Sequence, residues 1–434
     1  MSEMKKNCIK IVPVMFAFLF FCSAGAHAGG FQIYQAAAAD AMALGAATVG
    51  RDDLVSSAWY NPAAVMEFKD TRYSSGYSLA KINWTYEPGN GLAKMKVKDK
   101  IQIVPGSHLI HPLNSRYTAA FSFYTPYGLG MKWHDHEVQR LIDSGLYNDP
   151  GSSPAGMLVT KAITTTSDLK VPYFNSTIAT RISDKLSLAG GFSIIKADLK
   201  LRFLSKGMIL PATIAWNNFT EYRADGWGLG YVLAGHYNTG KDWKFGMRYL
   251  SNADVKMRGT VENHPTAGDT YMKGTMKLPA TLTVGCVNSG IDRWLFSFDV
   301  MWTEWNRFSQ LKIEPRHAWQ PADGGFTAPK NWKNTFSYRF GAEYKYCEHW
   351  TLRGGYVYDN SPIPEITRNF ELPGTDGHIF SLGASRKTDK YIFDVGYSYM
   401  ALDDGKAGQI PLNGVGRFTG ADNHFLMFSY SMKL

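Results

Sequence analysis

The chain has few cysteines and, beyond its first 28 residues, no long hydrophobic run. No later stretch reaches the roughly 18 apolar residues that a membrane-spanning helix needs. Cys8 and Cys22 fall within the first 28 residues, and Cys286 and Cys347 lie on segments that we expect not to be neighbours. The sequence therefore predicts neither a helical membrane protein nor a disulfide, metal or redox pair of thiols.

Motifs of catalysis are also missing. We find no Gly-Lys-Thr or Gly-Lys-Ser phosphate loop and no His-Glu-x-x-His run. His134 and His136 alternate in a polar loop, which is more typical of solvated surface than of a metal site. His236 has no nearby serine and acid at triad-like spacing. We expect no enzyme activity, no metal and no cofactor.

Alternation of apolar and polar residues dominates what is present. At the C-terminus Leu426, Phe428 and Tyr430 alternate with Met427 and Ser429, and residues 336–346 and 391–399 repeat the pattern with many aromatics. A period of two places the two sets on opposite faces of a strand. A polar face recurs in each of these strands, and no predicted helix is long enough to cover the apolar face of the sheet. Lipid outside and a polar lumen inside satisfy this pattern, which predicts an all-β transmembrane barrel.

The N-terminal residues have the pattern of a secretory signal. Lys5, Lys6 and Lys10 precede an apolar run at 11–22, and Ala26-His27-Ala28 follows, so residues 1–28 are expected to be a cleaved secretory signal. Its loss lowers the formal net charge from +9 to +7, because the signal holds three lysines and one glutamate. The remaining basic residues are scattered, which disfavours nucleic acid as a partner and leaves anionic outer-membrane lipid and lipopolysaccharide.

Fourteen antiparallel strands are expected in the barrel, with short turns and long loops alternating, as in outer-membrane barrels of Gram-negative bacteria. Their ranges are 72–84, 97–107, 115–126, 169–183, 185–203, 220–238, 242–259, 271–288, 292–314, 331–347, 349–362, 376–387, 389–402 and 418–434. The long loops are 127–168, 204–219, 260–270, 315–330, 363–375 and 403–417.

A small plug is expected ahead of the barrel of residues 71–434. Residues 29–70 are rich in alanine and hold the acidic pair Asp52-Asp53 and the turn Asn61-Pro62-Ala63. Because disordered tails are rarely this apolar, we favour a hatch inside the lumen over a loose periplasmic extension.

The chain resembles the FadL-like family, the outer-membrane transporters of long-chain fatty acids and of aromatic hydrocarbons. The resemblance covers essentially the whole mature chain and depends on the order of several short motifs: Gly30-Phe31-Gln32, Asp52-Asp53, Asn61-Pro62-Ala63, Tyr124-Thr125-Pro126-Tyr127-Gly128, 182–188, Leu278-Pro279, 302–308 and 355–364. It implies a monomeric barrel of fourteen strands closed by a hatch, with ligand captured by outer loops and released sideways through a kinked strand. The alanine-rich plug and the final Leu434 depart from the family pattern.

Residues of the outer loops supply a candidate capture surface. Val138, Leu141 and Ile142 recur at helical spacing, which predicts a short amphipathic helix. Its apolar face could receive an acyl chain, or it could pack on the loop that carries Met208 and Leu210. Both interpretations stay open.

Two basic residues are candidates for binding a carboxylate. The resemblance places Arg202 and Lys333 on strands that contribute an arginine and a lysine to the family's inner pocket. The alternative is the ordinary charge lattice of a polar lumen, since Arg248, Asp299, Arg339, Glu343, Arg353 and Asp394 also fall on predicted inward faces.

The sequence therefore predicts a passive outer-membrane channel for hydrophobic molecules, with long-chain fatty acids first. A channel for monoaromatic or alkane hydrocarbons is the main alternative, and a general polar porin is the second. The expected plug argues against an open porin.

Overall fold

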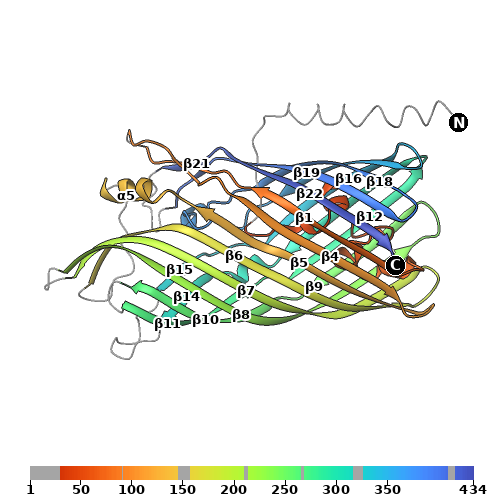
Figure 1. The fold of residues 1–434 in the computed structure, drawn as a ribbon, viewed down its shortest axis with the longest axis horizontal. Helices are drawn as coiled ribbons and strands as arrows, with labels where there is room; N and C mark the ends of the chain where they lie inside the picture. Colours follow the sequence, from red (N-terminus) through yellow and green to blue (C-terminus); the bar gives the residue numbers. More distant parts are fainter. Residues whose placement is uncertain are drawn as a thin grey trace.

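The computed structural model describes residues 30–89, 91–144, 157–209, 214–264, 268–315, 326–408 and 416–434. The predicted signal at 1–28 and Leu210 lie outside them. The described chain is a closed antiparallel barrel of fourteen strands, elongated along its axis (Figure 1). Ten strands are continuous: β1 (Arg72–Lys81), β4 (Ile101–Pro112), β5 (Tyr117–Lys132), β6 (Met157–Arg181), β7 (Leu186–Ile209), β8 (Ile214–Asn238), β17 (Trp350–Asp359), β18 (Gly377–Lys387), β19 (Tyr391–Leu402) and β22 (Ala421–Lys433).

The other four strands are each interrupted once. They are β9 with β10 (Trp243–Leu250, Ala253–His264), β11 with β12 (Gly268–Leu278, Thr281–Ile291), β13 with β14 (Trp294–Thr303, Gln310–Pro315) and β15 with β16 (Phe326–Pro329, Thr335–Lys345). Pro279 occupies one of the breaks and cannot donate to a ladder. The short helix η3 (Trp305–Arg307) occupies another. The breaks belong to four consecutive strands, so they form one irregular zone across the wall.

The first and last strands close the barrel. β1 pairs with β22 from Arg72↔Lys433 to Lys81↔His424, and the backbone N–H of Leu434 donates to the carbonyl of Thr71 at 3.0 Å. On β22, Phe428 is 41% exposed on the outer wall, whereas Met427 is fully buried on the inner side. The alternation read from the sequence is therefore confirmed, and Leu434 does not prevent closure.

The two ends of the barrel differ. Turns of two to four residues join strands at the end that holds the C-terminus. The other end carries the helix α5 (Asp135–Asp143) and a small sheet of β2 (Thr85–Glu87), β3 (Met95–Lys96), β20 (Gly405–Lys406) and β21 (Arg417–Thr419) (Figure 1). With outer-membrane topology, the first end faces the periplasm and the second faces outward.

Two predicted loops are wrong in extent. Both ends of 127–168 and most of 204–219 continue as strand, because β5 runs to Lys132, β6 starts at Met157, and β7 and β8 reach Ile209 and Ile214. These extensions project beyond the apolar band of the wall, so their outward side chains have no need to be apolar. The hydrophobic alternation that marks a membrane-spanning strand is consequently lost there.

The segment before β1 lies inside the barrel. It forms four short helical pieces: η1 (Tyr34–Ala37), α3 (Ala39–Ala43), α4 (Ser57–Tyr60) and η2 (Ala64–Glu67). Most of its residues are buried, and α3 contacts β17, β18, β19 and β22. Among the described residues, no helix is both long and apolar enough to cross a membrane. We call residues 31–67 the hatch.

Candidate functional site: a luminal cavity behind a gap in the wall

The wall of the barrel has a gap between β4 and β5. The two strands pair from Pro112↔Thr118 to Gly106↔Tyr124 and no further. At that height the pairing of β5 with β6 shifts register between Tyr124 and Tyr127. Pro126 lies inside this irregularity and has no N–H to donate, so β5 bends away from β4. Above the gap the strands' extensions meet again, where the N–H of Lys98 donates to the carbonyl of Lys132 at 2.6 Å.

A few groups cover the gap. The Nε2 of Gln102 donates to the carbonyl of Gly130 at 2.7 Å across it. From inside, the start of the hatch pairs with the bent strand, since the N–H of Ile33 donates to Pro126 at 2.7 Å and that of Gly128 donates to Phe31 at 2.9 Å. One side chain and three hatch residues therefore close the gap.

A cavity of about 100 Å³ lies directly behind this closure. Gln102 and Val104 of β4 and Gly128, Gly130 and Met131 of β5 line it, so both edges of the gap belong to its wall. The opposite walls are mainly apolar: Phe31, Ile33, Ala80, Ile82, Trp84, Leu372, Pro373, Met400, Leu402 and Phe425. Such a lining suits an apolar ligand with at most a few polar contacts.

Aromatic clusters flank the cavity. Toward the outer end Tyr86, Trp133, Phe370 and Phe418 pack edge to face or tilted, and the Trp133 indole N–H donates to the carbonyl of Phe370 at 3.0 Å. All four side chains are buried. This cluster, which we call the outer cap, closes the lumen above the cavity.

A second cluster surrounds Phe31 of the hatch. Its ring centroid lies 5.0 Å from Trp305, 5.5 Å from Phe308, 5.6 Å from Trp332 and 5.7 Å from Tyr127. Trp305, Phe308 and Trp332 come from the breaks of β13/β14 and β15/β16. The interrupted strands therefore form an aromatic cage for the first residues of the hatch.

Arg248 is a cation in the lumen without a carboxylate partner. It lies on β9, only 1% exposed, and its Nε, Nη1 and Nη2 have no hydrogen-bond partner within the described chain. Its guanidinium lies 4.5 Å from the ring centroid of Trp59 in the hatch. Its cross-strand neighbour Thr283 and the nearby Thr281 also keep their hydroxyls unbonded. A buried charge without partners is costly, and it is a natural place for an anion.

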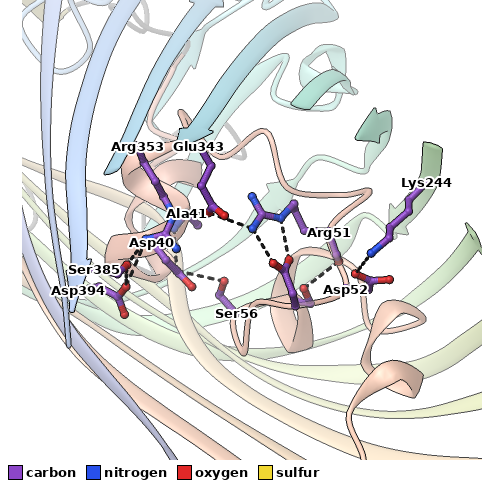
Figure 2. A network of polar contacts seen from close by, with 12 residues as sticks. Asp40, Ala41, Arg51, Asp52, Ser56, Lys244, Glu343, Arg353, Ser385 and Asp394 are labelled. Carbon is purple, nitrogen blue, oxygen red and sulfur yellow. Dashed lines mark hydrogen bonds and ion pairs between the residues drawn. The ribbon is translucent and has the colours of Figure 1, made fainter. Parts of the chain in front are cut away.

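Ion pairs hold the hatch in the barrel (Figure 2). Arg51 pairs with Asp53 at 2.7 Å and with Glu343 of β16 at 3.0 Å. Arg353 of β17 continues the network through Glu343 at 2.7 Å. Lys244 of β9 reaches Asp52 at 2.5 Å. The predicted hatch acids Asp52 and Asp53 are thus both engaged.

Asp40 of the hatch belongs to the same network. Its Oδ1 accepts from the N–H of Ala41 at 2.7 Å and from the hydroxyl of Ser56 at 3.3 Å. Burial raises the pKa of Asp40 above its usual value, although Arg353 and Arg51 oppose the shift. The charged form of Asp40 therefore depends on these two arginines.

The turn at Asn61, Pro62 and Ala63 is buried against the barrel. The Nδ2 of Asn61 donates to Val49 within the hatch at 2.6 Å and to Gly235 of β8 at 3.1 Å. The hydroxyl of Ser187 on β7 donates to the carbonyl of Ala63 at 2.8 Å. This predicted turn therefore ties the hatch to two strands.

The two basic residues implied by the resemblance lie apart from the cavity lining. Arg202 of β7 lies beside α5, where its Nη1 is 3.0 Å from both carboxylate oxygens of Asp135 and its guanidinium is 3.7 Å from the Phe219 ring centroid. Lys333 is exposed in the break before β16, where its backbone N–H donates to Pro362 at 3.0 Å. Arg202 already has a counterion, and Lys333 is open to solvent.

The predicted amphipathic helix forms as α5. Val138, Leu141 and Ile142 are at most 2% exposed and belong to the core of the outer end, where α5 contacts β6 and β7. Met208 lies on β7, near its end at Ile209. The apolar face of α5 packs against the strands, so an acyl chain could reach it only by displacing part of this contact.

The residues at the gap were not predicted from the sequence. Gln102 and Gly130 gave no charge or motif signal, and Gly128 was noted only as part of the motif at 124–128, although a proline and two glycines within residues 124–130 indicate an irregular strand. Arg248 was predicted to face inward, which is correct, but it was assigned to the general charge lattice. Within the described residues no group of three or more His, Cys, Asp or Glu side chains could hold a metal ion.

Comparisons with known proteins agree with this architecture. The family model described as "Outer membrane protein transport protein (OMPP1/FadL/TodX)" matches residues 19–142 and 155–421. The long-chain fatty acid transport protein of Escherichia coli K12 is 24% identical over 425 residues, covering 87% of this chain and 89% of that protein.

Solved structures are similar in fold. A Pseudomonas aeruginosa FadL homologue matches with a TM-score of 0.76 and 17% identity, covering 93% of this chain and 100% of that one. The toluene transporter TbuX of Ralstonia pickettii matches with a TM-score of 0.67 and 17% identity, covering 93% and 99%.

Proposed function

Because the chain belongs to the OMPP1/FadL/TodX family of outer membrane transport proteins, we propose that it is a passive channel for hydrophobic small molecules, principally long-chain fatty acids. In this proposal a monomer captures the ligand at its outer end, near α5. The ligand then passes the outer cap into the apolar cavity and leaves sideways into the bilayer between β4 and β5. No step requires bond making, so no catalytic residue is assigned.

The cavity behind the wall gap carries the proposal. A molecule held there touches Gln102 and Gly130, the two groups that bridge the gap. Moving the Gln102 side chain and the Phe31–Ile33 segment would connect the cavity with lipid, which is where a hydrophobic molecule partitions. The hatch fills the lumen below, which disfavours the general porin.

Arg248 supports a carboxylate-bearing ligand. Within the described chain it has neither a counterion nor a hydrogen-bond partner, whereas Arg202 is paired with Asp135 and Arg353 with Glu343. Among those described residues Arg339 also forms no ion pair, but it donates to Ser337 and Met301. Arg248 lies outside the cavity lining, so the proposal requires the acyl chain to extend from the cavity toward it. A neutral hydrocarbon has no use for such a cation. We therefore place the fatty acid head group at Arg248 in preference to Arg202 or Lys333, and expect it to displace Trp59 from the guanidinium.

The size of the cavity favours a second candidate, uptake of monoaromatic hydrocarbons. An apolar cavity of about 150 Å³ is known to hold benzene, so about 100 Å³ is closer to one ring than to a long acyl chain. The fatty acid proposal therefore requires the hatch or the outer cap to move on binding.

The test is binding of oleate and of toluene to the refolded barrel, measured for the wild type and for Arg248→Met. A charge-assisted contact contributes about 1.5–3 kcal/mol, so oleate should bind about 10- to 150-fold more weakly to the variant, with toluene unchanged. Arg202→Ala and Lys333→Ala are the comparison variants. If either of them weakens oleate binding and Arg248→Met does not, the head group lies elsewhere. Toluene binding that equals or exceeds oleate binding in the wild type would favour the hydrocarbon channel.

A further inference from the structure

The outer wall carries a cationic hollow of about 480 Å³ that is separate from the lumen. Three strand segments above the zone of breaks line it, namely β10, β11 and β14. Its charged lining consists of Lys256, Arg258, Lys273, Lys277, Lys312 and Glu314. The hollow thus has five cations and one carboxylate, and all five cations are exposed. We call these residues the basic hollow.

Three of its cations have no carboxylate partner. Glu314 pairs with Lys273 at 3.1 Å and with Lys312 at 2.7 Å. Within the described residues, Lys256, Arg258 and Lys277 form no ion pair. Asp225, which lies opposite Arg258 on β8, is held instead by Lys196. The hollow therefore has unbalanced positive charge.

The height of the hollow indicates what it faces. Below the breaks, the outward residues of the same strands are apolar: Trp243, Phe245, Met247, Val284 and Phe296 are all more than 40% exposed. Above the breaks, the outward positions of β10, β11 and β14 are mainly charged: they hold the five cations together with Asp254, Glu262, Asp269 and Glu314, of which Asp254 pairs with Arg307. The outer edge of the hydrocarbon layer therefore falls at the breaks, and the hollow lies at the level of the lipid head groups.

We propose that the basic hollow binds a phosphate group of lipid A, the phosphorylated glycolipid anchor of lipopolysaccharide in the outer leaflet. A phosphate monoester carries a charge of about −1.5 to −2, which Lys and Arg complement at close range. The apolar band directly below receives the acyl chains of the same molecule. A soluble anion would gain the first contact and not the second. This site is independent of the luminal cavity and of the proposed uptake.

The test uses the full-length barrel in detergent with two probes, bisphosphorylated lipid A and its dephosphorylated form, measured by native mass spectrometry. The triple variant Lys256→Gln, Arg258→Gln, Lys277→Gln should bind bisphosphorylated lipid A at least 10-fold more weakly, with little change for the dephosphorylated form. The matched control is Lys345→Gln, Arg386→Gln, Lys387→Gln at the periplasmic end, which should bind as the wild type does.

Three results would overturn the proposal. They are equal binding of the two lipids by the wild type, unchanged binding by the triple variant, and displacement of lipid A by millimolar inorganic phosphate, which would indicate a simple anion site. Oleate uptake by the triple variant serves as the folding control and should match the wild type. Failure of uptake in the wild type would count against the proposed function and not against this site.

Discussion

Single inward-facing glycines decide where the hatch can lie. An added Cβ at Gly246 would lie 1.8 Å from the carbonyl oxygen of Val49, and one at Gly106 would lie 2.2 Å from that of Ala37. The barrel wall therefore receives the hatch backbone at positions that tolerate no side chain. The alanines of the hatch serve the same close packing from the other side.

We predict that Gly246→Ala loosens the hatch while the barrel remains folded. Overpacking of this kind destabilises the contact by about 1–3 kcal/mol. The hatch can shift to relieve it, whereas the strands are fixed by their pairing with both neighbours. The expected result is higher ion conductance in planar bilayers with unchanged heat-modifiable migration. The control is Gly235→Ala on the neighbouring strand, where the nearest atom to an added Cβ is Leu188 Cδ2 at 3.5 Å. Equal conductance of the two variants would show that the close approach is unimportant.

At the scale of elements, the bend of β5 is what separates this barrel from a continuous wall. A proline and a register shift release β5 from β4, and the hatch supplies the missing pairing from inside. The gap, the cavity and the start of the hatch are therefore one structural unit. Movement of the hatch and opening of the wall should be coupled.

We predict that Gly130→Phe blocks lateral exit. The new Cβ would meet the flexible amide of Gln102, which can swing aside and leave the ring in the gap. Oleate uptake by cells should fall by about an order of magnitude, since escape into lipid then requires expelling the ring. The control is Gly354→Phe on the outer wall, where the nearest atom to an added Cβ is Leu382 Cδ2 at 3.7 Å. Full uptake by Gly130→Phe would exclude this exit.

A second prediction at this scale concerns α5. Arg202→Met removes the ion pair with Asp135 and the contact with Phe219, together about 1–1.5 kcal/mol, so α5 should detach more often. Trypsin should then cleave after Arg140 about 5- to 10-fold faster. Arg223→Met, which removes an exposed pair with Glu221 on β8, is the control. Unchanged cleavage would mean that the core contacts of α5 suffice to hold it.

On the scale of the whole molecule, the barrel and the hatch are held by different forces. Continuous strand pairing closes the barrel through β1 and β22, without any contribution from the hatch. The hatch depends instead on buried ion pairs and on close contacts with inward-facing residues. The barrel should therefore be stable without its plug, whereas the hatch has no fold of its own.

We predict that deletion of residues 34–67 gives a folded but open barrel. Only a closed ring of strands is needed to satisfy the backbone in lipid, and this ring remains intact. The variant should resist detergent unfolding and admit small polar sugars in a liposome-swelling assay, which the wild type should exclude. A variant that fails to insert would show that the hatch contributes to barrel assembly.

The sequence by itself determined the barrel and its strand count, because alternation of period two is a local property that lipid on one face makes unambiguous. The expectation of a hatch came instead from the apolar, alanine-rich composition of residues 29–70. The sequence also placed Arg248, Glu343 and Arg353 on the inner face. It could not determine the extent of the long strands, whose outer parts lose the apolar signal. Only the tertiary structure decided that Arg248 has neither a counterion nor a hydrogen-bond partner among the described residues, since pairing depends on which strands and hatch residues meet. The wall gap and the basic hollow were likewise decided there, because the gap depends on where β5 shifts register against β6 and stops pairing with β4, and the hollow depends on β14 lying beside β11.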